Sequence, residues 1–107
     1  MQIAITDQNG VTIAEVDGEI NISTSPALKK EFEKVSNPKV VINLSKVGYV
    51  DSSGLATLVE ILKKNKAKGG KICLTHLSDK VKSLFEITKL DKLFQIFPDD
   101  QAALAQF

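Results

Sequence analysis

The stretch from residue 40 to residue 62 constrains the fold of this chain more than any other part of the sequence. It begins with Val40–Leu44, a short run rich in β-branched residues, which is typical of a strand buried on both faces beside a parallel neighbour. An amphipathic helix follows, because Leu55, Leu58 and Leu62 recur at helical spacing. A buried strand that leads into such a helix indicates an α/β domain.

The same alternation of strand and helix patterns covers the rest of the chain. Strands are expected at Gln2–Thr6, Val11–Val16, Val40–Leu44, Lys71–Thr75 and Phe94–Phe97. The first of them alternates as a half-buried strand does, and the turn Asp7–Gly10 joins it to the second. Four helices are expected: one from Pro26 ended by residues 36–38, one after residue 54 ended by Gly69-Gly70, one capped by Ser78, and one from Pro98 to Phe107.

The order β-β-α-β-α-β-α-β-α predicts the topology. Strands that alternate with helices form right-handed crossovers onto a mostly parallel sheet. The opening hairpin adds an antiparallel edge, so the sheet is mixed. Since no repeat or linker is visible, we expect one α/β domain over residues 1–107 with about four helices.

The composition excludes several classes of function. The formal net charge is +1, which argues against a nucleic-acid or anionic membrane surface as partner. The single cysteine, Cys73, excludes an intramolecular disulfide and is expected to be a buried core thiol. No signal peptide and no apolar stretch of about 20 residues is visible. We therefore expect a soluble cytoplasmic protein with no membrane insertion.

The residue patterns of enzymes and metal sites are also missing. His76 and Cys73 are the only soft metal ligands, and a zinc site needs three or four. Gly69-Gly70-Lys71 lies after a helix and before a strand, whereas a phosphate-binding loop needs the reverse order. We expect His76 to be a structural or surface residue, and the chain to be no enzyme and to need no metal or cofactor of its own.

The segment Asp51-Ser52-Ser53-Gly54 lies between the buried strand and the strongest helix. Asp51 or Ser52 is expected to cap that helix. A helix N-terminus presents free N–H groups and partial positive charge, so a phosphate attached there is tolerated by the fold. Phosphorylation adds about −1.5 to −2 charge. In a partner interface, this charge beside Asp51 would disrupt binding more than it disrupts folding.

The segment Val40–Ala56 resembles the signature of the STAS domain, as found in bacterial anti-sigma factor antagonists. The family pattern is a hydrophobic strand, a short connection and then Asp-Ser-Ser/Thr-Gly-Leu, which matches residues 51–55. Gly18-Glu-Ile-Asn21 and Gly69-Gly70 match further family positions. The resemblance covers nearly the whole chain and implies a single STAS-like domain.

The resemblance implies a partner-switching cycle in which Ser52 is the phosphoacceptor, with Ser53 as the alternative. The unphosphorylated protein would bind an anti-sigma factor that is also a serine kinase, and so release the sigma factor. The kinase would then phosphorylate Ser52 with ATP and dissociate, and a metal-dependent serine phosphatase would reset the protein. ATP and magnesium belong to the kinase in this cycle.

The resemblance also implies a binding face made of the Gly18–Thr24 loop, the Val47–Gly54 loop and the first turns of the second helix. We expect Val50 to be at least partly buried. Tyr49 is expected either to pack at the edge of the core or to contact the partner. Asn21 departs from the Asp that many members carry, which leaves a role for a carboxylate there open. The expected partner-binding residues are Gly18, Glu19, Asn21, Ser23, Thr24, Tyr49, Asp51, Ser52, Ser53 and Gly54.

Two other functions compete with the phosphorylation switch. STAS domains also serve as accessory subunits of lipid-transport ATPase complexes and as tails of anion transporters, and the pair Ser52-Ser53 favours the switch over these roles. A nucleotide hydrolase would need a phosphate cradle and a base, which this sequence lacks. We expect the free protein to be a monomer.

Overall fold

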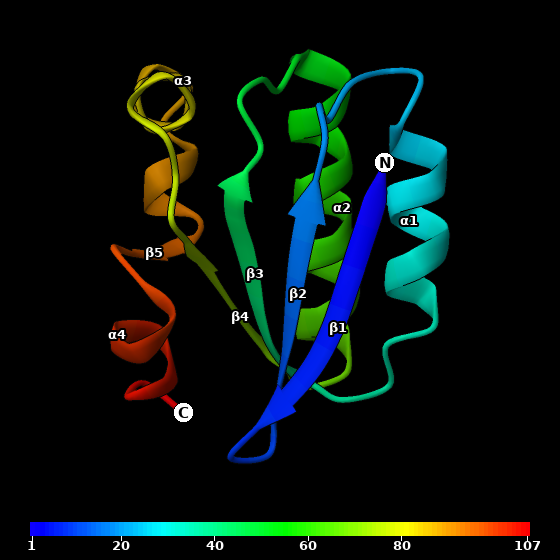
Figure 1. The fold of residues 1–107 in the computed structure, drawn as a ribbon, viewed down its shortest axis with the longest axis vertical. Helices are drawn as coiled ribbons and strands as arrows, with labels where there is room; N and C mark the ends of the chain where they lie inside the picture. Colours follow the sequence, from blue (N-terminus) through cyan, green and yellow to red (C-terminus); the bar gives the residue numbers. More distant parts are fainter.

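The computed structural model describes residues 1–107, which form one five-stranded sheet in the order β1-β2-β3-β4-β5. β1 and β2 pair antiparallel, and the other neighbours pair in parallel (Figure 1). The mixed, mostly parallel sheet with an N-terminal hairpin and four helices confirms the predicted fold class. The elements are β1 (Gln2–Gln8), β2 (Val11–Asp17), α1 (Ser25–Glu33), β3 (Lys39–Lys46), α2 (Ser52–Ala67), β4 (Lys71–Thr75), α3 (Asp79–Ile87), a 3-10 turn η1 (Leu90–Lys92), β5 (Gln95–Phe97) and α4 (Asp100–Leu104).

The N-terminal hairpin is tighter than the sequence suggested. Its turn is only Asn9 and Gly10, both with positive φ, so the strands pair from Gln8 opposite Val11 to Gln2 opposite Asp17. The prediction of a half-buried first strand was wrong for most of β1. Only Ile3 is partly buried, and Ile5 is exposed, because β1 is the edge of the sheet.

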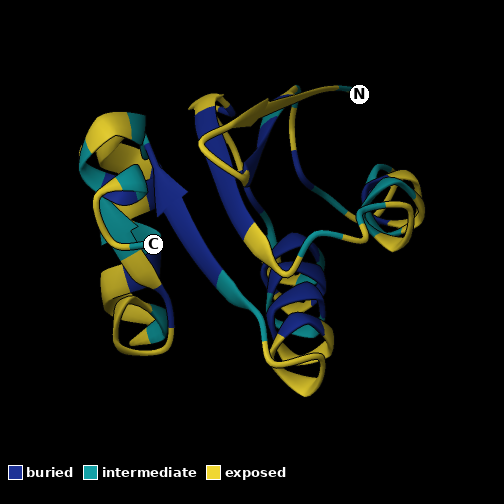
Figure 2. Ribbon diagram, turned by 90° about the horizontal axis from the view of Figure 1, so that it is seen from below, coloured by how far each residue is buried: buried dark blue, intermediate teal, exposed yellow.

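Alternate residues of the central strands enter two cores on opposite faces of the sheet. Val40 and Ile42 of β3 join the large core, where residues of α1, α2 and α3 pack. Val41, between them, points to the other face and joins a small core with Ala103 of α4. Figure 2 shows the buried central strands between helices on both sides. β3 is therefore buried on both faces, as predicted, because each face is covered by helix.

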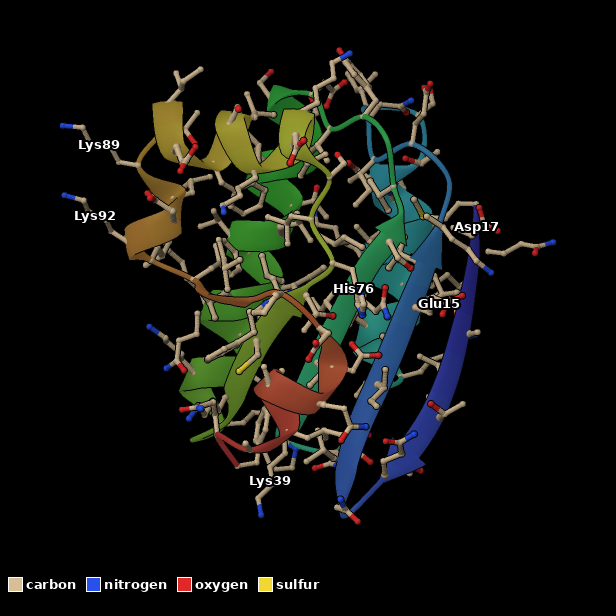
Figure 3. All side chains as sticks on the ribbon, turned by 60° about the vertical axis from the view of Figure 1, so that its left-hand side comes forward. Glu15, Asp17, Lys39, His76, Lys89 and Lys92 are labelled. Carbon is tan, nitrogen blue, oxygen red and sulfur yellow. The ribbon has the colours of Figure 1, made fainter.

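Several single-residue expectations are confirmed by burial. Leu58 and Leu62 lie in the large core, and Val50 is buried with them. Cys73 is fully buried in the small core, and this burial raises the pKa of its thiol. His76 is a partly exposed residue at the end of β4, where its Nε2 lies 3.9 Å from Asp100 Oδ1 (Figure 3).

Helix ends differ from the sequence pattern by a few residues. α1 ends at Glu33, so Val35 packs against the core from outside the helix. α2 ends as predicted, with Gly69 in the left-handed conformation after its last turn. α4 ends at Leu104 and not at Phe107. No helix has the length and apolar character needed to cross a membrane, and no three His, Cys, Asp or Glu side chains gather where they could hold a metal ion.

Candidate functional site

The two loops expected to bind a partner lie side by side at one end of the sheet. The loop after β2 and the loop after β3 are joined by a parallel bridge between Ile20 and Val50. The Ile20 amide donates to the Tyr49 carbonyl at 3.0 Å, and the Asp51 amide donates to the Ile20 carbonyl at 3.1 Å. Because both loops follow the carboxyl ends of parallel strands, they meet beside the N-terminus of α2, which lies at the top of Figure 1.

Asp51 caps α2 and ties the two loops together with one carboxylate. Its backbone is extended, and its Oδ1 accepts from the Gly54 amide at 2.7 Å. Its Oδ2 accepts from the Ile22 amide, in the other loop, at 3.1 Å. The sequence left Asp51 and Ser52 open as the cap. The structure assigns the cap to Asp51, which makes Ser52 the first residue of the helix.

Gly54 allows the helix to approach the loop after β2. A Cβ at Gly54 would overlap the Ile20 carbonyl oxygen and would lie 2.8 Å from Ile20 Cγ2. Gly54 itself is buried. The glycine of the Asp-Ser-Ser-Gly segment is therefore required by this close contact between two backbones.

Ser52 and Ser53 face different sides of the helix start. Ser52 is exposed, and its hydroxyl forms no hydrogen bond within the chain. It borders a hollow beside α3, shared with Tyr49 and Leu84. Ser53 is half-buried and borders a second hollow beside α1, shared with Ser25. The two hydroxyls are thus reached from different directions.

The loop before α1 is held by its own side chains. Asn21 Oδ1 accepts from the amides of Ser23 and Thr24 at 2.9 and 3.1 Å. Thr24 Oγ1 donates to the Glu19 carbonyl at 2.8 Å and accepts from the Asn21 amide at 2.9 Å. These short bonds fix the loop without a partner protein.

Asn21 forms one side-chain bond in addition to those that hold the turn. Its Nδ2 donates to Glu19 Oε2 at 3.3 Å, a bond that an aspartate cannot form. A carboxylate could accept the two amide bonds equally well, so the turn itself does not require Asn.

The remaining expected residue of this loop is Gly18, which directly follows β2. Its φ of 127° favours glycine, and its amide donates to the Lys46 carbonyl at 3.2 Å. A Cβ there would lie 3.6 Å from Met1 Cα. Nearby, the Lys46 ammonium lies 2.9 Å from Glu15 Oε1, and this hydrogen bond raises the pKa of Lys46.

Exposed apolar side chains lie on both sides of the helix start: Tyr49 and Ile87 share the hollow beside Ser52, and Ile22 borders the hollow beside Ser53. The expected contact residues included neither Ile87 nor Ile22, although Ile22 lies in the expected Gly18–Thr24 loop. Ile22 and Ile87 are 71% and 79% exposed, and Tyr49 is 42% exposed. Lys80 Nζ lies 5.6 Å from the Tyr49 ring centre, which holds this cation over the aromatic face. Ile87 lies off the apolar stripe of α3, and Ile22 is an apolar residue in a polar loop. Both signals were visible in the sequence.

Comparisons with known proteins identify the family of this chain. The family model of the STAS domain matches residues 2–103. The anti-sigma-B factor antagonist of Staphylococcus aureus is 31% identical over 103 residues, covering 90% of this chain and 92% of that protein. The anti-sigma F factor antagonist of Paenibacillus polymyxa is 24% identical over 110 residues, covering 99% of this chain and 94% of that protein.

A solved structure shows the same fold over almost the whole chain. The anti-sigma factor antagonist from Mycobacterium paratuberculosis superposes with a TM-score of 0.88 at 30% identity, covering 98% of this chain and 92% of that one. The family match, the fold and the Asp-Ser-Ser-Gly segment at the start of α2 lead to one assignment. This chain belongs to the STAS domain family.

Proposed function

We propose that this protein is an anti-sigma factor antagonist whose binding to a serine kinase is switched off by phosphorylation of Ser52. The observation that carries the proposal is the position of Ser52. Its exposed hydroxyl lies at the first residue of α2, free of internal hydrogen bonds and directly after Asp51, whose carboxylate ties the two loops together. The names of the relatives support the antagonist role.

The surroundings of Ser52 explain how one phosphate would change binding. Tyr49 and Ile87 are exposed and share its hollow, and they are suited to the desolvated centre of an interface. A phosphate on Ser52 would place about −1.5 to −2 charge beside Asp51 and among these apolar groups. Burying that charge against a partner is costly unless the partner supplies matching cations. Phosphorylation therefore disrupts the complex.

The same position explains why the fold would survive the modification. Negative charge at a helix N-terminus is favourable to the helix dipole by about 0.3–1 kcal/mol. Ser52 forms no bond that phosphorylation would break, and no residue has to move to expose it. The proposed switch acts on the surface and leaves the two cores unchanged.

The proposed partners are an anti-sigma factor with serine kinase activity and a serine phosphatase. The kinase supplies ATP and magnesium and transfers the phosphate to Ser52, and the phosphatase removes it. Contacts would come from both loops and the start of α2, namely Gly18, Glu19, Asn21, Ser23, Thr24, Tyr49, Asp51, Ser52, Ser53 and Gly54.

A pull-down from cell extract with matched baits tests the proposal. Wild type and Ser36→Asp, which adds the same charge at an exposed serine outside the proposed face, should retain a soluble serine kinase, and Ser52→Asp should lose it. With the captured kinase and ATP, Ser53→Ala should be phosphorylated and Ser52→Ala should not. If Ser52→Asp retains the kinase, or if a membrane ATPase is captured in its place, the proposal is wrong.

A further inference from the structure

The hollow beside Ser52 contains one cation. Lys80, in the first turn of α3, borders this hollow together with Ser52 and Asp51. No other residue that lines the hollow is positively charged. The start of α2 and α3 both lie at the upper end of the molecule in Figure 1. A group attached to the Ser52 hydroxyl would therefore share one concave surface with Lys80.

Lys80 has no acidic partner in the protein. It is exposed, and none of the ion pairs of the chain includes it. Ser83 and Leu84 occupy the positions three and four residues later on α3, where an acidic side chain could have paired with it. Its Nζ lies 5.6 Å from the centre of the Tyr49 ring, an exposed contact that is weaker than a charge-assisted hydrogen bond to a phosphate.

Asp51, the one acidic residue that borders the hollow, is already bonded elsewhere. Its Oδ1 accepts from the Gly54 amide at 2.7 Å, and its Oδ2 accepts from the Ile22 amide at 3.1 Å. The charges of Asp51 and Lys80 cancel formally in the unmodified protein. A phosphate on Ser52 adds about −1.5 to −2 charge, and Lys80 is the group of the hollow that can compensate part of it.

We propose that Lys80 is the counter-ion of phosphorylated Ser52. This inference rests on Ser52 as the modified residue in the function proposed for the protein. When the phosphate is attached, the flexible side chain of Lys80 leaves the Tyr49 ring and donates to the phosphate oxygens across the hollow. The phosphorylated protein then carries an ion pair between α2 and α3 and an uncovered Tyr49 ring. Modification therefore changes the shape of this surface as well as its charge.

Full-length protein with phosphoserine incorporated at position 52 during translation tests the pairing without a kinase. Phosphorus-31 NMR titration reports the second pKa of the phosphate, which a nearby cation lowers and Asp51 raises. Lys80→Met should raise this pKa by about half a unit. Lys82→Met, the control, removes a lysine of α3 that borders a different hollow, and it should change the pKa by no more than about 0.1. Equal changes in the two variants, or none for Lys80→Met, would overturn the proposal.

The position of Lys80 gives a second readout in the same protein. In the unmodified protein the Tyr49 ring should shift the side-chain proton signals of Lys80 upfield, and Tyr49→Leu should remove that shift. Phosphoserine at position 52 should move the Lys80 signals towards their ordinary values. Phosphoserine in place of Ser36, an exposed serine after α1, should leave them unchanged. Lys80 signals that respond to neither phosphoserine, or equally to both, would overturn the pairing.

Failure of this pairing and failure of the proposed function are seen in different experiments. A kinase that phosphorylates Ser52→Ala refutes Ser52 as the phosphoacceptor and leaves the NMR result on the incorporated phosphoserine unchanged. A phosphate pKa that does not depend on Lys80 refutes the counter-ion and leaves the kinase assay unchanged.

Discussion

Gly54 of α2 lies against the backbone of Ile20 so closely that no side chain fits between them. This contact seats the helix that carries Ser52 on the loop after β2, and it fixes the distance between the two loops of the partner face. The contact therefore matters both for stability and for the shape of the proposed binding surface.

Replacement of Gly54 by alanine should separate the two backbones. Its Cβ would lie 2.8 Å from Ile20 Cγ2 and closer still to the Ile20 carbonyl oxygen, so the loop or the helix must shift. We expect Gly54→Ala to lower the free energy of unfolding by about 1–3 kcal/mol in urea titrations and to weaken kinase binding. Gly48→Ala is the control, since its Cβ meets nothing within 4 Å. Equal stability of the two variants would contradict this account.

Asp51 should contribute more than a helix cap usually does. Asp99 caps α4 through a single bond to the Ala102 amide, whereas Asp51 also bonds the Ile22 amide. Asp99→Ala should cost about 1 kcal/mol. Asp51→Ala should cost about 1 kcal/mol more, because two amides lose their acceptor. Equal losses in urea denaturation would show that the bond to Ile22 contributes nothing.

Charge at Ser52 should leave the stability of the fold unchanged. Ser52→Asp adds a negative charge at the helix N-terminus, which the dipole favours, and brings it near Asp51, which opposes it. The two effects oppose each other. We therefore expect the free energy of unfolding, measured by urea titration, to change by no more than about 0.5 kcal/mol. A larger loss would mean that phosphorylation acts by loosening the domain and not by blocking an interface.

The thiol of Cys73 should be inert in the folded protein. Cys73 is fully buried, and this burial raises its pKa, so that the reactive thiolate is scarce at neutral pH. A thiol reagent such as DTNB should label it only in step with unfolding in urea. The variant Ser36→Cys, at an exposed position, should react at once in the native state. Rapid labelling of Cys73 in native buffer would contradict the packing of the small core.

The contact between Lys29 and Glu60 should make a small part of the stability depend on pH. The hydrogen bond from Lys29 lowers the pKa of Glu60 in the folded state. Its contribution is therefore present above the unfolded pKa of about 4.3 and is lost as the pH falls through the lower folded value. The difference in urea midpoint between wild type and Glu60→Gln should shrink below about pH 4. A difference that is constant from pH 7 to pH 3 would contradict this effect.

Sequence periodicity was sufficient for the fold class and for the large core. The β-branched run of β3 and the leucines of α2 are both patterns typical of buried residues, and members of both lie in the large core. Local turn chemistry predicted the cap by Ser78 and the left-handed Gly69. These features depend on residues close together in the chain, so the sequence alone contains the signal.

Element ends and edge burial were less predictable for a physical reason. Ile5 alternates as a half-buried residue does, yet no helix covers that part of β1. Val35 continues the apolar stripe of α1 but packs on the core after the helix has ended. Periodicity reports which side chains are apolar, and only the packing of neighbouring elements decides how much of each is covered.

The sequence by itself determined the order of the elements, the Asp-Ser-Ser-Gly segment and its position at the start of a helix. Only the tertiary structure decided that Asp51 bonds Ile22, 29 residues away, and that Ser52 and Ser53 face different hollows. Contacts between residues far apart in the chain depend on how parallel strands bring their loops together. Local sequence patterns do not indicate which of these loops become neighbours.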